Sequence, residues 1–399
     1  MNGRDGNGLS PRGGVLLTGA TGFVGMEILA RLIERTDRPI YPLVRADDDE
    51  AAERRIREVV RTLAGSEDAC DDRVFAVRGD IEQPQLGLSE ERRQLLAEQV
   101  SDVLHVAASV SFTLPLEEAR AINVEGTRRV LELAELCEGL RRFSYVSTAY
   151  VAGTHKGDFC EHDVDVGQRF HNSYEQTKFE AERLVRSYGE RMPIQVFRPS
   201  IIVGDSVTGW TSSFNVMYMP LKAFERYPSY AVPARKGAPV DVVPIDFVAS
   251  AMVELVEHPD ERQDTYHLVA ADNATTIGRL MKSAARYFGR RRPPAVPTPI
   301  YKHLLHPLIL RLVSDKQRAA LRKTEVFFPY FSLRVRYDDR RTRRRLARAG
   351  ISVTPVEKYF DTLVDFARRA KWGKVEMPRV TSQAMRASAE ATRRHAPVG

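Results

Sequence analysis

Tyr174 and Lys178 stand four residues apart in the stretch NSYEQTKFEAERL. If this stretch is helical, that spacing places a phenol and an ammonium on one face of the helix. A free tyrosine titrates near pH ~10, so by itself it is a poor acid–base group at neutral pH. A neighbouring cation favours the phenolate and would bring its pKa closer to the working pH. The pair therefore indicates proton transfer to or from a carbonyl or hydroxyl oxygen.

A second motif, TGATGFVG, follows the apolar run GVLL directly and precedes a helical pattern. A strand, a glycine-rich turn and a helix in that order form the context that a phosphate-binding turn needs. Gly19 permits the tight turn, Gly22 lets backbone N–H groups approach a pyrophosphate, and Gly25 lets the helix pack closely on the strand. The sequence therefore predicts a dinucleotide site. Its predicted contacts are Gly19, Thr21, Gly22, Phe23, Val24 and Gly25.

The second apolar run, YPLV, ends in Arg45. At this position a carboxylate holds a ribose 2′-hydroxyl, whereas an arginine accepts a 2′-phosphate. A guanidinium pairs with phosphate, so Arg45 predicts NADPH rather than NADH. Two alternatives stay open, namely an Arg45 that faces solvent and an NAD site that uses Asp47.

Short β-branched runs alternate with longer helical patterns from Gly13 onward, as in GVLLTGA, IYPLV, DVLHVAAS and RRFSYVSTA. Repeated strand–helix–strand units predict an α/β fold, a doubly wound parallel Rossmann sheet covered on both faces. The run RRFSYVSTA ends in Ser147 and Thr148, so their hydroxyls are expected at the same sheet edge as the glycine turn. We expect a single long helix over residues 119–136 and another around Tyr174 to Tyr188.

The composition changes at the proline-rich stretch RRRPPAVPTP, which follows Gly289. Residues 279–350 hold 20 Lys/Arg against 4 Asp/Glu, a net charge of +16, so the rest of the chain carries −9. We expect helical stretches at YKHLLHPLILRLVSDKQRAALRK and DDRRTRRRLARAG. The predicted organisation is a disordered tail (1–12), a dinucleotide-binding domain (13–289) that includes substrate-binding segments (about 205–289), a basic helical region (290–378) and a flexible tail (379–399).

Cysteine usage and hydropathy indicate an enzyme of a reducing compartment. Cys70, Cys137 and Cys160 lie far apart, without a CxxC pair or a histidine cluster at ligand spacing, so we expect no metal site and no disulfide framework. The N-terminus lacks the apolar segment of a signal peptide, and nowhere do 18 apolar residues run together. The expectation is a cytoplasmic protein, with peripheral membrane contact left open.

The glycine motif, the STA strand end, YxxxK and RPSIIVG together resemble the extended short-chain dehydrogenase/reductases. In that superfamily the hydroxyl residue before the alanine is the third catalytic member, which corresponds to Thr148 rather than Ser147. The resemblance implies that Thr148 and Tyr174 hydrogen-bond the substrate oxygen. It also implies that Lys178 holds the nicotinamide ribose, so that Tyr174 and Lys178 both contact the cofactor.

Further stretches resemble fatty acyl-CoA reductases and the thioester-reductase domains of carboxylic acid reductases and peptide synthetases. They include LVRADDDEAAERR, RGDIEQPQLGLS and LHVAASVSFTLPLEEARAINVEGTRRVLELA, and the similarity spans about Gly13 to Leu268. Asn123 is expected either to order the site's backbone and water or simply to serve its helix. The resemblance implies cofactor contacts at Arg55 beside Arg45, at Asp80 and Ile81 around the adenine, at Ala107, Ala108 and Ser109 along the ribose and pyrophosphate, and at Pro199, Ser200 and Ile201 along the nicotinamide.

By this resemblance the function is an NADPH-dependent reduction of an acyl thioester, either acyl-CoA or acyl-carrier protein, to an aldehyde or alcohol. The alternatives are a hydroxysteroid-type dehydrogenase or a sugar-nucleotide epimerase or dehydratase on the same scaffold, and an NADP-binding sensor without turnover. The basic C-terminal region suits an anionic membrane surface, a carrier protein or the phosphates of CoA, but also an ordinary solvated face. Nucleic acid is not the expected partner, since DDRRTRRRLARAG lacks interleaved aromatic residues.

Overall fold

The structure, a computed structural model of the chain, describes residues 13–65, 72–226, 231–259, 263–315, 318, 321–322 and 325–379. The chain forms two compact units. Unit 1 comprises Met1–Val151, Asn172–Arg198 and Ala249–Tyr266, and unit 2 comprises Ala152–His171, Pro199–Val248 and His267–Gly399. The units therefore alternate along the chain rather than meeting at one boundary near Gly289. Residues 1–12, Cys70 and residues 380–399 lie outside the described part.

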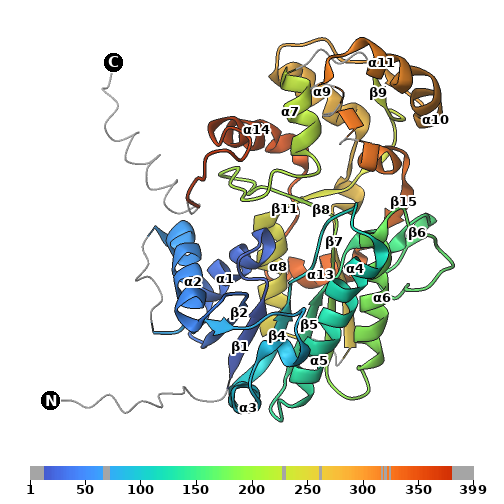
Figure 1. Cartoon of the computed structure of the whole chain (residues 1–399). Helices are drawn as coiled ribbons and strands as arrows, with labels where there is room; N and C mark the ends of the chain where they lie inside the picture. The colour runs from blue at the N-terminus through green and yellow to red at the C-terminus, as the bar shows by residue number, and fades with distance from the viewer. Residues whose placement is uncertain are drawn as a thin grey trace, which may run out of the picture. The chain divides into compact units, whose positions relative to one another are not determined.

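Unit 1 is built on a seven-stranded sheet (Figure 1). Its strands are β1 (Gly14–Thr18), β2 (Ile40–Val44), β3 (Val77–Arg78), β4 (Val100–His105), β5 (Arg142–Val146), β7 (Ile194–Pro199) and β12 (Gln263–Leu268). They lie in the order β12-β7-β5-β4-β1-β2-β3, and the pairs from β7 through β3 are parallel. This topology confirms the predicted doubly wound α/β fold, in which ligands bind beyond the carboxyl ends of the strands.

Three neighbouring strands lead directly into residues that the sequence singled out. Thr18 at the end of β1 pairs with His105 at the end of β4, and His105 pairs with Tyr145 near the end of β5. Because these strands are parallel, the segments that follow them emerge at one edge of the sheet. The glycine turn after β1, residues 107–109 after β4 and Thr148 after β5 therefore start from the same edge.

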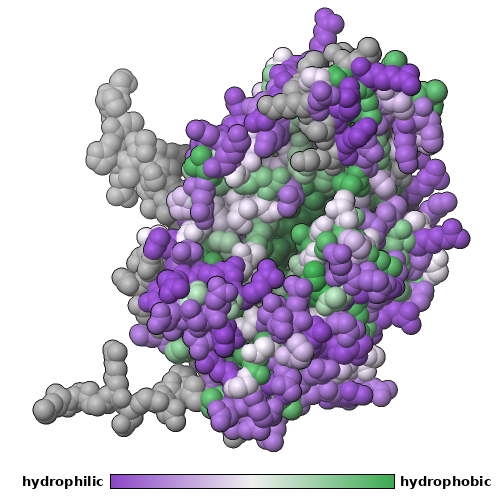
Figure 2. Space-filling model, in the orientation of Figure 1, coloured by the Kyte–Doolittle hydropathy of each residue, from purple (hydrophilic) through white to green (hydrophobic). Residues whose placement is uncertain are grey.

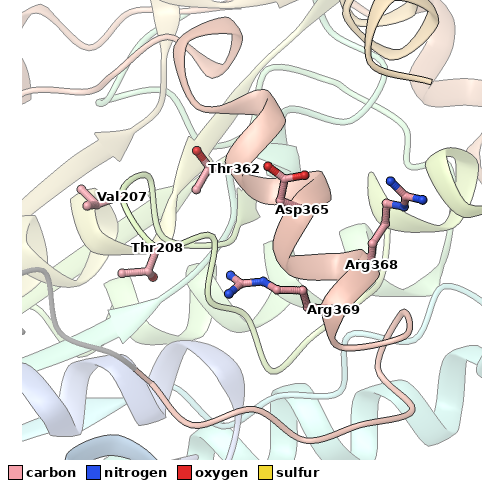
Figure 3. A pocket seen from close by; sticks show the side chains of 6 residues that line it. All are labelled: Val207, Thr208, Thr362, Asp365, Arg368 and Arg369. Carbon is pink, nitrogen blue, oxygen red and sulfur yellow. The ribbon is translucent and has the colours of Figure 1, made fainter. Parts of the chain in front are cut away.

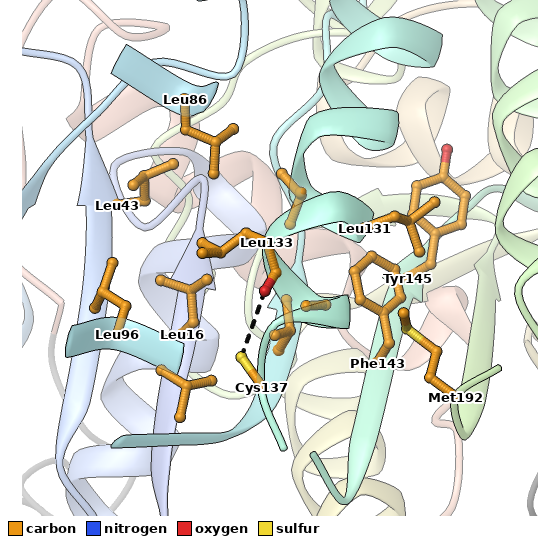
Figure 4. Close-up of a cluster of buried hydrophobic side chains, with 14 of the residues drawn as sticks. Leu16, Leu43, Leu86, Leu96, Leu131, Leu133, Cys137, Phe143, Tyr145 and Met192 are labelled. Atoms are coloured by element: carbon orange, nitrogen blue, oxygen red, sulfur yellow. Dashed lines mark hydrogen bonds between the residues drawn. The ribbon is translucent and has the colours of Figure 1, made fainter. Parts of the chain in front are cut away.

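Buried apolar side chains hold the helices of unit 1 against this sheet. Figure 4 shows part of this cluster, with Leu16 of β1, Leu131 of α5 and Phe143 of β5, each fully buried. The Cys137 thiol lies in the same cluster and donates to the Leu133 carbonyl at 3.6 Å. Burial of this kind stabilises by about 1.5–3 kcal/mol per large side chain. The helices are α1 (Phe23–Arg35), α2 (Asp49–Ala64), α3 (Glu90–Gln99), α4 (Leu116–Arg120), α5 (Gly126–Glu135), α6 (Ser173–Ser187) and α8 (Ile245–Glu257), which continues from unit 2.

The helix expected over residues 119–136 contains an irregularity. Its chain runs through α4 into a π-helical turn, η3 (Ala121–Glu125), and only then into α5. Buried Asn123 lies in this turn, and its side chain bonds the backbone of Ser109. Single π-turns inside α-helices frequently occur at functional sites, where they re-aim a side chain. Periodicity alone does not reveal such a turn.

Unit 2 consists of short elements. Its two-stranded pairs are β8 (Ile201–Val203) with β11 (Val242–Pro244), β9 (Val232–Pro233) with β14 (Ala295–Val296), β10 (Pro239–Val240) with β13 (Thr275–Thr276), and β6 (Lys156–Phe159) with β15 (Arg334–Tyr337). Its helices include α7 (Tyr218–Arg226), α9 (Ile277–Tyr287), α10 (Thr298–Ile300), η6 (Tyr301–Leu305), α11 (His306–Leu312), η7 (Glu325–Ser332), α13 (Arg340–Ala347), η8 (Val356–Lys358) and α14 (Phe360–Arg369). A buried cluster around Phe360, Leu363 and Val364 forms its core.

Two expected stretches are interrupted. The run PIQVFRPSIIVG divides into β7 of unit 1 and β8 of unit 2 because Pro199 has no N–H to continue the ladder, and the Ser200 N–H donates to Leu268 instead. The helical stretch expected from Tyr301 breaks after Leu312, where Val313 has extended backbone, and Asp315 is helical again.

The surface around α2 is hydrophilic. Figure 2 shows hydrophilic side chains over the face of unit 1 around α2, where Glu50, Glu53, Arg54 and Arg57 are exposed. Among the described residues, we find no helix with the length and apolar character needed to cross a membrane.

Candidate active site

Thr148 and Tyr174 meet at the carboxyl edge of the sheet in unit 1. Tyr174 lies in the first turn of α6, whose N-terminus is capped by Asn172 through a 3.0 Å bond from the Glu175 N–H. Thr148 follows β5, is 3% exposed, and its hydroxyl hydrogen-bonds Tyr174. Two of the three residues predicted to be catalytic are thus in direct contact. A carbonyl oxygen placed between them would receive two hydroxyl hydrogen bonds.

Lys178 lies one turn farther along α6 and is 3% exposed. Its Nζ donates to the Val146 carbonyl at 2.7 Å and lies 4.1 Å from the centre of the Tyr145 ring. Burial lowers the pKa of Lys178 to about 7, although the Glu182 carboxylate opposes this shift. An ammonium with a pKa near neutrality gains or loses its charge in the pH range in which the protein works.

The Tyr174 phenol differs from the expectation drawn from the YxxxK spacing. Burial raises the pKa of Tyr174 to about 12, and the hydrogen bond with Thr148 offsets only part of this rise. The expected lowering by Lys178 is absent from this structure, because the ammonium donates to Val146 instead. A phenol with such a pKa keeps its proton at neutral pH, which suits it to donate that proton during a reduction.

The glycine turn between β1 and α1 has the geometry of a phosphate-binding turn. Gly19 has φ +75°, and a Cβ on it would lie 2.8 Å from the Ala107 nitrogen; a Cβ on Gly25 would lie 2.0 Å from the Gly19 carbonyl oxygen. Neither position tolerates a side chain. Helix α1 begins after Gly22 with no side-chain cap and no acidic residue in its first turn. Its N-terminus therefore suits the pyrophosphate of a dinucleotide, with Thr21, Phe23 and Val24 in the same turn.

Arg45 and Arg55 lie together at the end of β2. Arg45 is exposed and pairs with Glu82 at 3.3 Å, while the Arg55 guanidinium donates to the Arg45 carbonyl. Asp80 is half-buried and accepts from the Glu82 N–H, and Ile81 packs near Gly126. The two arginines can thus reach a common anion.

The segment Ala107, Ala108 and Ser109 after β4 is held by Thr18, which the sequence did not single out, and by Asn123. The Thr18 hydroxyl accepts from the Val106 and Ala107 N–H groups at 3.1 Å. The Asn123 amide bonds the Ser109 N–H at 2.7 Å and the Ser109 carbonyl at 3.1 Å, and it also reaches Thr177 of α6 at 2.9 Å. These contacts favour the first interpretation of Asn123, that it orders the backbone of the site.

The remaining predicted contacts, Pro199, Ser200 and Ile201, belong to unit 2. Unit 2 also holds an open pocket of about 780 Å³. Figure 3 shows the carboxylate of Asp365 and the guanidinium groups of Arg368 and Arg369 on α14 around it. Arg368 pairs with Glu225 at 2.9 Å. The remaining lining residues are Val207, Thr208 and Thr362.

Among the residues that the structure describes, one group of metal-binding residue types occurs, and it lies in unit 2. Ligand atoms of Cys160, His162 and Asp163 lie within 4.8 Å of one another. The Asp163 carboxylate already accepts from the Cys160 N–H at 2.7 Å, and the His162 imidazole is largely exposed. This geometry adds no buried ligand set, so the absence of a metal stays a prediction.

Several known proteins are similar in sequence to part of this chain. Glycine betaine reductase ATRR of Emericella nidulans is 32% identical over 273 residues, which are 66% of this chain and 21% of that protein. Nonribosomal peptide synthetase asaC of Aspergillus flavus is 32% identical over 64% of this chain and 26% of its own length. Fatty acyl-CoA reductase wat of Drosophila melanogaster is 29% identical over 69% of this chain and 60% of its own length. The chain therefore spans only part of these relatives.

Solved structures share the architecture. The terminal R domain from the myxalamid PKS-NRPS biosynthetic pathway superposes with a TM-score of 0.77 and 30% identity, over 93% of each chain. A reductase domain of a nonribosomal peptide synthetase from Mycobacterium tuberculosis has the same fold, with a TM-score of 0.70 and 23% identity over 92% of this chain and 94% of that one. Fold, glycine turn and these similarities define an extended short-chain dehydrogenase/reductase, an NAD(P)H-dependent oxidoreductase. Residues 17–252 match the family described as Male sterility protein, and the chain belongs to that family.

Proposed function

We propose that the protein reduces an acyl thioester, carried by CoA or by an acyl-carrier protein, to an aldehyde or alcohol with NADPH. The observation that carries this proposal is the pair of hydroxyls at Thr148 and Tyr174 beside buried Lys178, at the edge where the glycine turn follows β1. The similarity to a peptide-synthetase reductase domain over 93% of both chains favours a thioester over other carbonyl substrates.

The proposed chemistry assigns each residue a step. A bound reduced nicotinamide supplies a hydride to the thioester carbon. Tyr174 gives its proton to the carbonyl oxygen, and the Thr148 hydroxyl stabilises the charge that develops there. In the resulting hemithioacetal, the hydroxyl proton returns to the Tyr174 phenolate as the C–S bond breaks. The thiolate leaves with a proton from water, and the aldehyde remains; a second round would give the alcohol.

We propose NADPH as the reductant because two guanidinium groups, Arg45 and Arg55, lie at the end of β2. The Arg45 pair with exposed Glu82 is solvated and weak, so a 2′-phosphate can replace it at little cost. An NAD site that uses Asp47 is the alternative, and it predicts equal use of NADH. The roles of Asp80, Ile81, Ala107, Ala108, Ser109, Pro199, Ser200 and Ile201 as further cofactor contacts belong to the same proposal.

We also propose that the basic C-terminal region contacts the acyl carrier. Exposed Ile300, Leu304 and Leu308 recur every four residues through α10, η6 and α11, beside exposed Lys302 and Arg311. An apolar stripe flanked by cations suits an acidic carrier protein, and it suits an anionic lipid surface as well. Pull-down with acylated carrier protein and co-sedimentation with anionic liposomes, each repeated with Leu304→Gln, distinguish these partners. A variant that binds both as well as the parent protein removes this part of the proposal.

The test of the function is NADPH consumption against a panel of acyl-CoA and acyl-carrier thioesters, with products trapped as aldehyde or alcohol. We expect turnover with at least one thioester and release of a stoichiometric thiol. Oxidation of a hydroxysteroid, or conversion of a nucleotide sugar without thioester turnover, would establish the alternative enzymes. Binding of NADPH without turnover of any of these would instead support a sensor. The expected cytoplasmic location is a separate prediction, tested by cell fractionation.

A further inference from the structure

Glu182 lies one turn beyond Lys178 on α6 and is completely buried. The sequence motifs give this residue no role, and the chemistry proposed above does not use it. An ionised carboxylate is rarely buried unless cations and hydrogen bonds compensate it. A buried carboxylate this close to a catalytic ammonium therefore calls for a physical explanation.

The carboxylate of Glu182 joins three elements. Arg198 of β7, itself fully buried, donates to both oxygens, from Nε at 3.1 Å and from a terminal nitrogen at 2.6 Å. Ser147, which follows β5, donates its hydroxyl at 2.7 Å. Arg186, one turn farther along α6, donates at 2.9 Å and also binds Thr265 of β12 at 2.5 Å. Glu182 thus connects α6 to β7 and to the end of β5, and its partner Arg186 extends the contact to β12.

The bond to Ser147 bears directly on the reactive groups. Ser147 is preceded by Val146, whose carbonyl accepts from Lys178, and followed by Thr148, whose hydroxyl bonds Tyr174. Holding Ser147 therefore restrains both of its neighbours, because each is joined to it by one planar peptide. A carboxylate at position 182 sets the spacing between the strand end and the helix.

The charges around Lys178 come from every element that packs on it. His105 of β4 is held neutral, since burial lowers its pKa to about 3, and burial keeps the Tyr145 and Tyr174 phenols protonated by raising their pKa values. Burial alone would raise the pKa of Glu182, but Arg198, Arg186 and Ser147 outweigh it and lower that pKa to about 2. The charge that opposes the effect of burial on the ammonium is the Glu182 carboxylate, which Arg198 and Arg186 hold in place; Glu175, three residues before Lys178 on α6, is also buried.

We propose that Glu182 is a positioning residue for this site: it holds the strand end that carries Thr148 against the helix that carries Tyr174, and its negative charge helps buried Lys178 to retain its proton. The catalytic consequence rests on the proposed function, whereas the ionisation of Lys178 and its effect on cofactor binding do not. Lys178 has lost most of its hydration, so a neighbouring anion is the group that can retain its charge.

Two substitutions should move the Lys178 ionisation in opposite directions. Glu182→Gln removes the anion and leaves the two arginines, so the ammonium should lose its proton about 1 pH unit lower. Arg186→Gln removes one cation and leaves the carboxylate, so the ammonium should lose its proton at a higher pH, by a smaller shift. A purely structural role for Glu182 would lower stability in both variants without giving shifts of opposite sign. Glu180→Gln, which breaks the surface pair with Arg120 on the same helix, is the matched control.

The experiment measures NADPH binding by fluorescence from pH 5.5 to 9 for the four proteins, together with kcat/KM for an acyl thioester over the same range. Binding should weaken as pH rises through the Lys178 transition, and that transition should move down in Glu182→Gln and up in Arg186→Gln relative to Glu180→Gln. If both variants show the control's transition, the proposal is wrong. Opposite shifts in binding without turnover of any thioester would uphold it while refuting the proposed function.

Ser147→Ala tests only the positioning of Thr148 and Val146. It also keeps the proposal testable if Glu182→Gln does not fold. It removes one hydrogen bond and leaves every charge in place, so the NADPH transition should stay at the pH of the parent protein. The expected result is a loss in kcat of about 10-fold, because Thr148 and the Val146 carbonyl lose their anchor. Unchanged kcat in Ser147→Ala would overturn the positional role, and rescue of kcat by Ser147→Thr would support it.

Discussion

Glu182 of unit 1 and two carboxylates of unit 2, Asp241 and Asp246, are buried in different ways. In unit 1, Glu182 is compensated by two arginines, and its pKa is lowered to about 2 even though burial acts in the opposite direction. In unit 2, Asp241 accepts from the Ala270 and Ala271 N–H groups at 2.7 and 2.9 Å, and burial raises its pKa. Asp246 of the same unit also has a raised pKa, from burial and from the nearby Asp205. Arginine cations compensate the buried charge of Glu182, whereas neutral N–H and hydroxyl groups bond Asp241 and Asp246.

Because the pKa shifts have opposite signs, these carboxyls change the free energy of unfolding with pH in opposite directions. The raised pKa values of Asp241 and Asp246 mean that their stabilising contribution is fully present below the unfolded-state pKa and is lost as pH rises through the folded-state pKa. The lowered pKa of Glu182 means that its contribution is present above the unfolded-state value and is lost only as pH falls toward about 2. Unit 1 therefore keeps its buried anion charged under working conditions, whereas in unit 2 the ionisation of buried carboxyls lowers stability.

The largest effect should come from Tyr174→Phe in unit 1. Loss of the proton donor should lower kcat by about 10²–10⁴-fold, whereas NADPH affinity should be retained because the ring still packs near Phe112. Steady-state kinetics with an acyl thioester and fluorescence titration measure both. Tyr188→Phe, at the far end of α6, is the matched control. Full activity in Tyr174→Phe would show that the reaction centre lies elsewhere.

Next in size is Gly25→Ala in the glycine turn. The added Cβ would lie 2.0 Å from the Gly19 carbonyl oxygen, so the turn must move and NADPH affinity should fall by about 100-fold or more. Gly139→Ala is the control, since a Cβ there meets nothing within 4 Å. Isothermal titration with NADPH measures both variants. Equal affinities would mean that the dinucleotide does not use this turn.

A smaller and more selective effect is expected from Arg45→Ala. Arg45 is the exposed charge proposed to pair with a 2′-phosphate, so its removal should raise KM for NADPH by about 10-fold and leave KM for NADH unchanged. Arg57→Ala, an exposed arginine of α2 that pairs with Glu53, should change neither constant. If both coenzymes respond alike to Arg45→Ala, Arg45 does not read the phosphate, and the alternative with Asp47 gains support.

The smallest effect tests the unit 2 side of the comparison. Asp246→Asn can keep both bonds to Ser206 while it removes the repulsion with Asp205. At pH 8 the free energy of unfolding should rise by up to about 1 kcal/mol, and this gain should be smaller at pH 4, because the raised pKa of Asp246 favours the protonated carboxyl as pH falls. Urea unfolding at both pH values measures this, with exposed Asp315→Asn as the control. A gain that is independent of pH would contradict the stated cause.

Local patterns were sufficient for most of unit 1. Alternating apolar runs and helical periodicity predicted its strands and helices, since each of these elements is long enough to repeat its pattern several times. The glycine turn was equally readable, because its spacing follows from one local backbone geometry. Unit 2 was harder to predict. Its strands of two residues are too short to show a periodic pattern, and no local pattern marks the break after Leu312.

The amino-acid sequence alone determined the doubly wound sheet, the phosphate-binding turn and the placement of Tyr174 and Lys178 on one helix face. These features depend on neighbours within a few residues or within one strand–helix unit. Only the tertiary structure decided that Lys178 bonds Val146 rather than Tyr174, and that Glu182 meets Arg198 and Ser147. Such contacts join elements that lie far apart in sequence. Burial, together with these contacts, decides which of the side chains stay charged, and no local pattern specifies it.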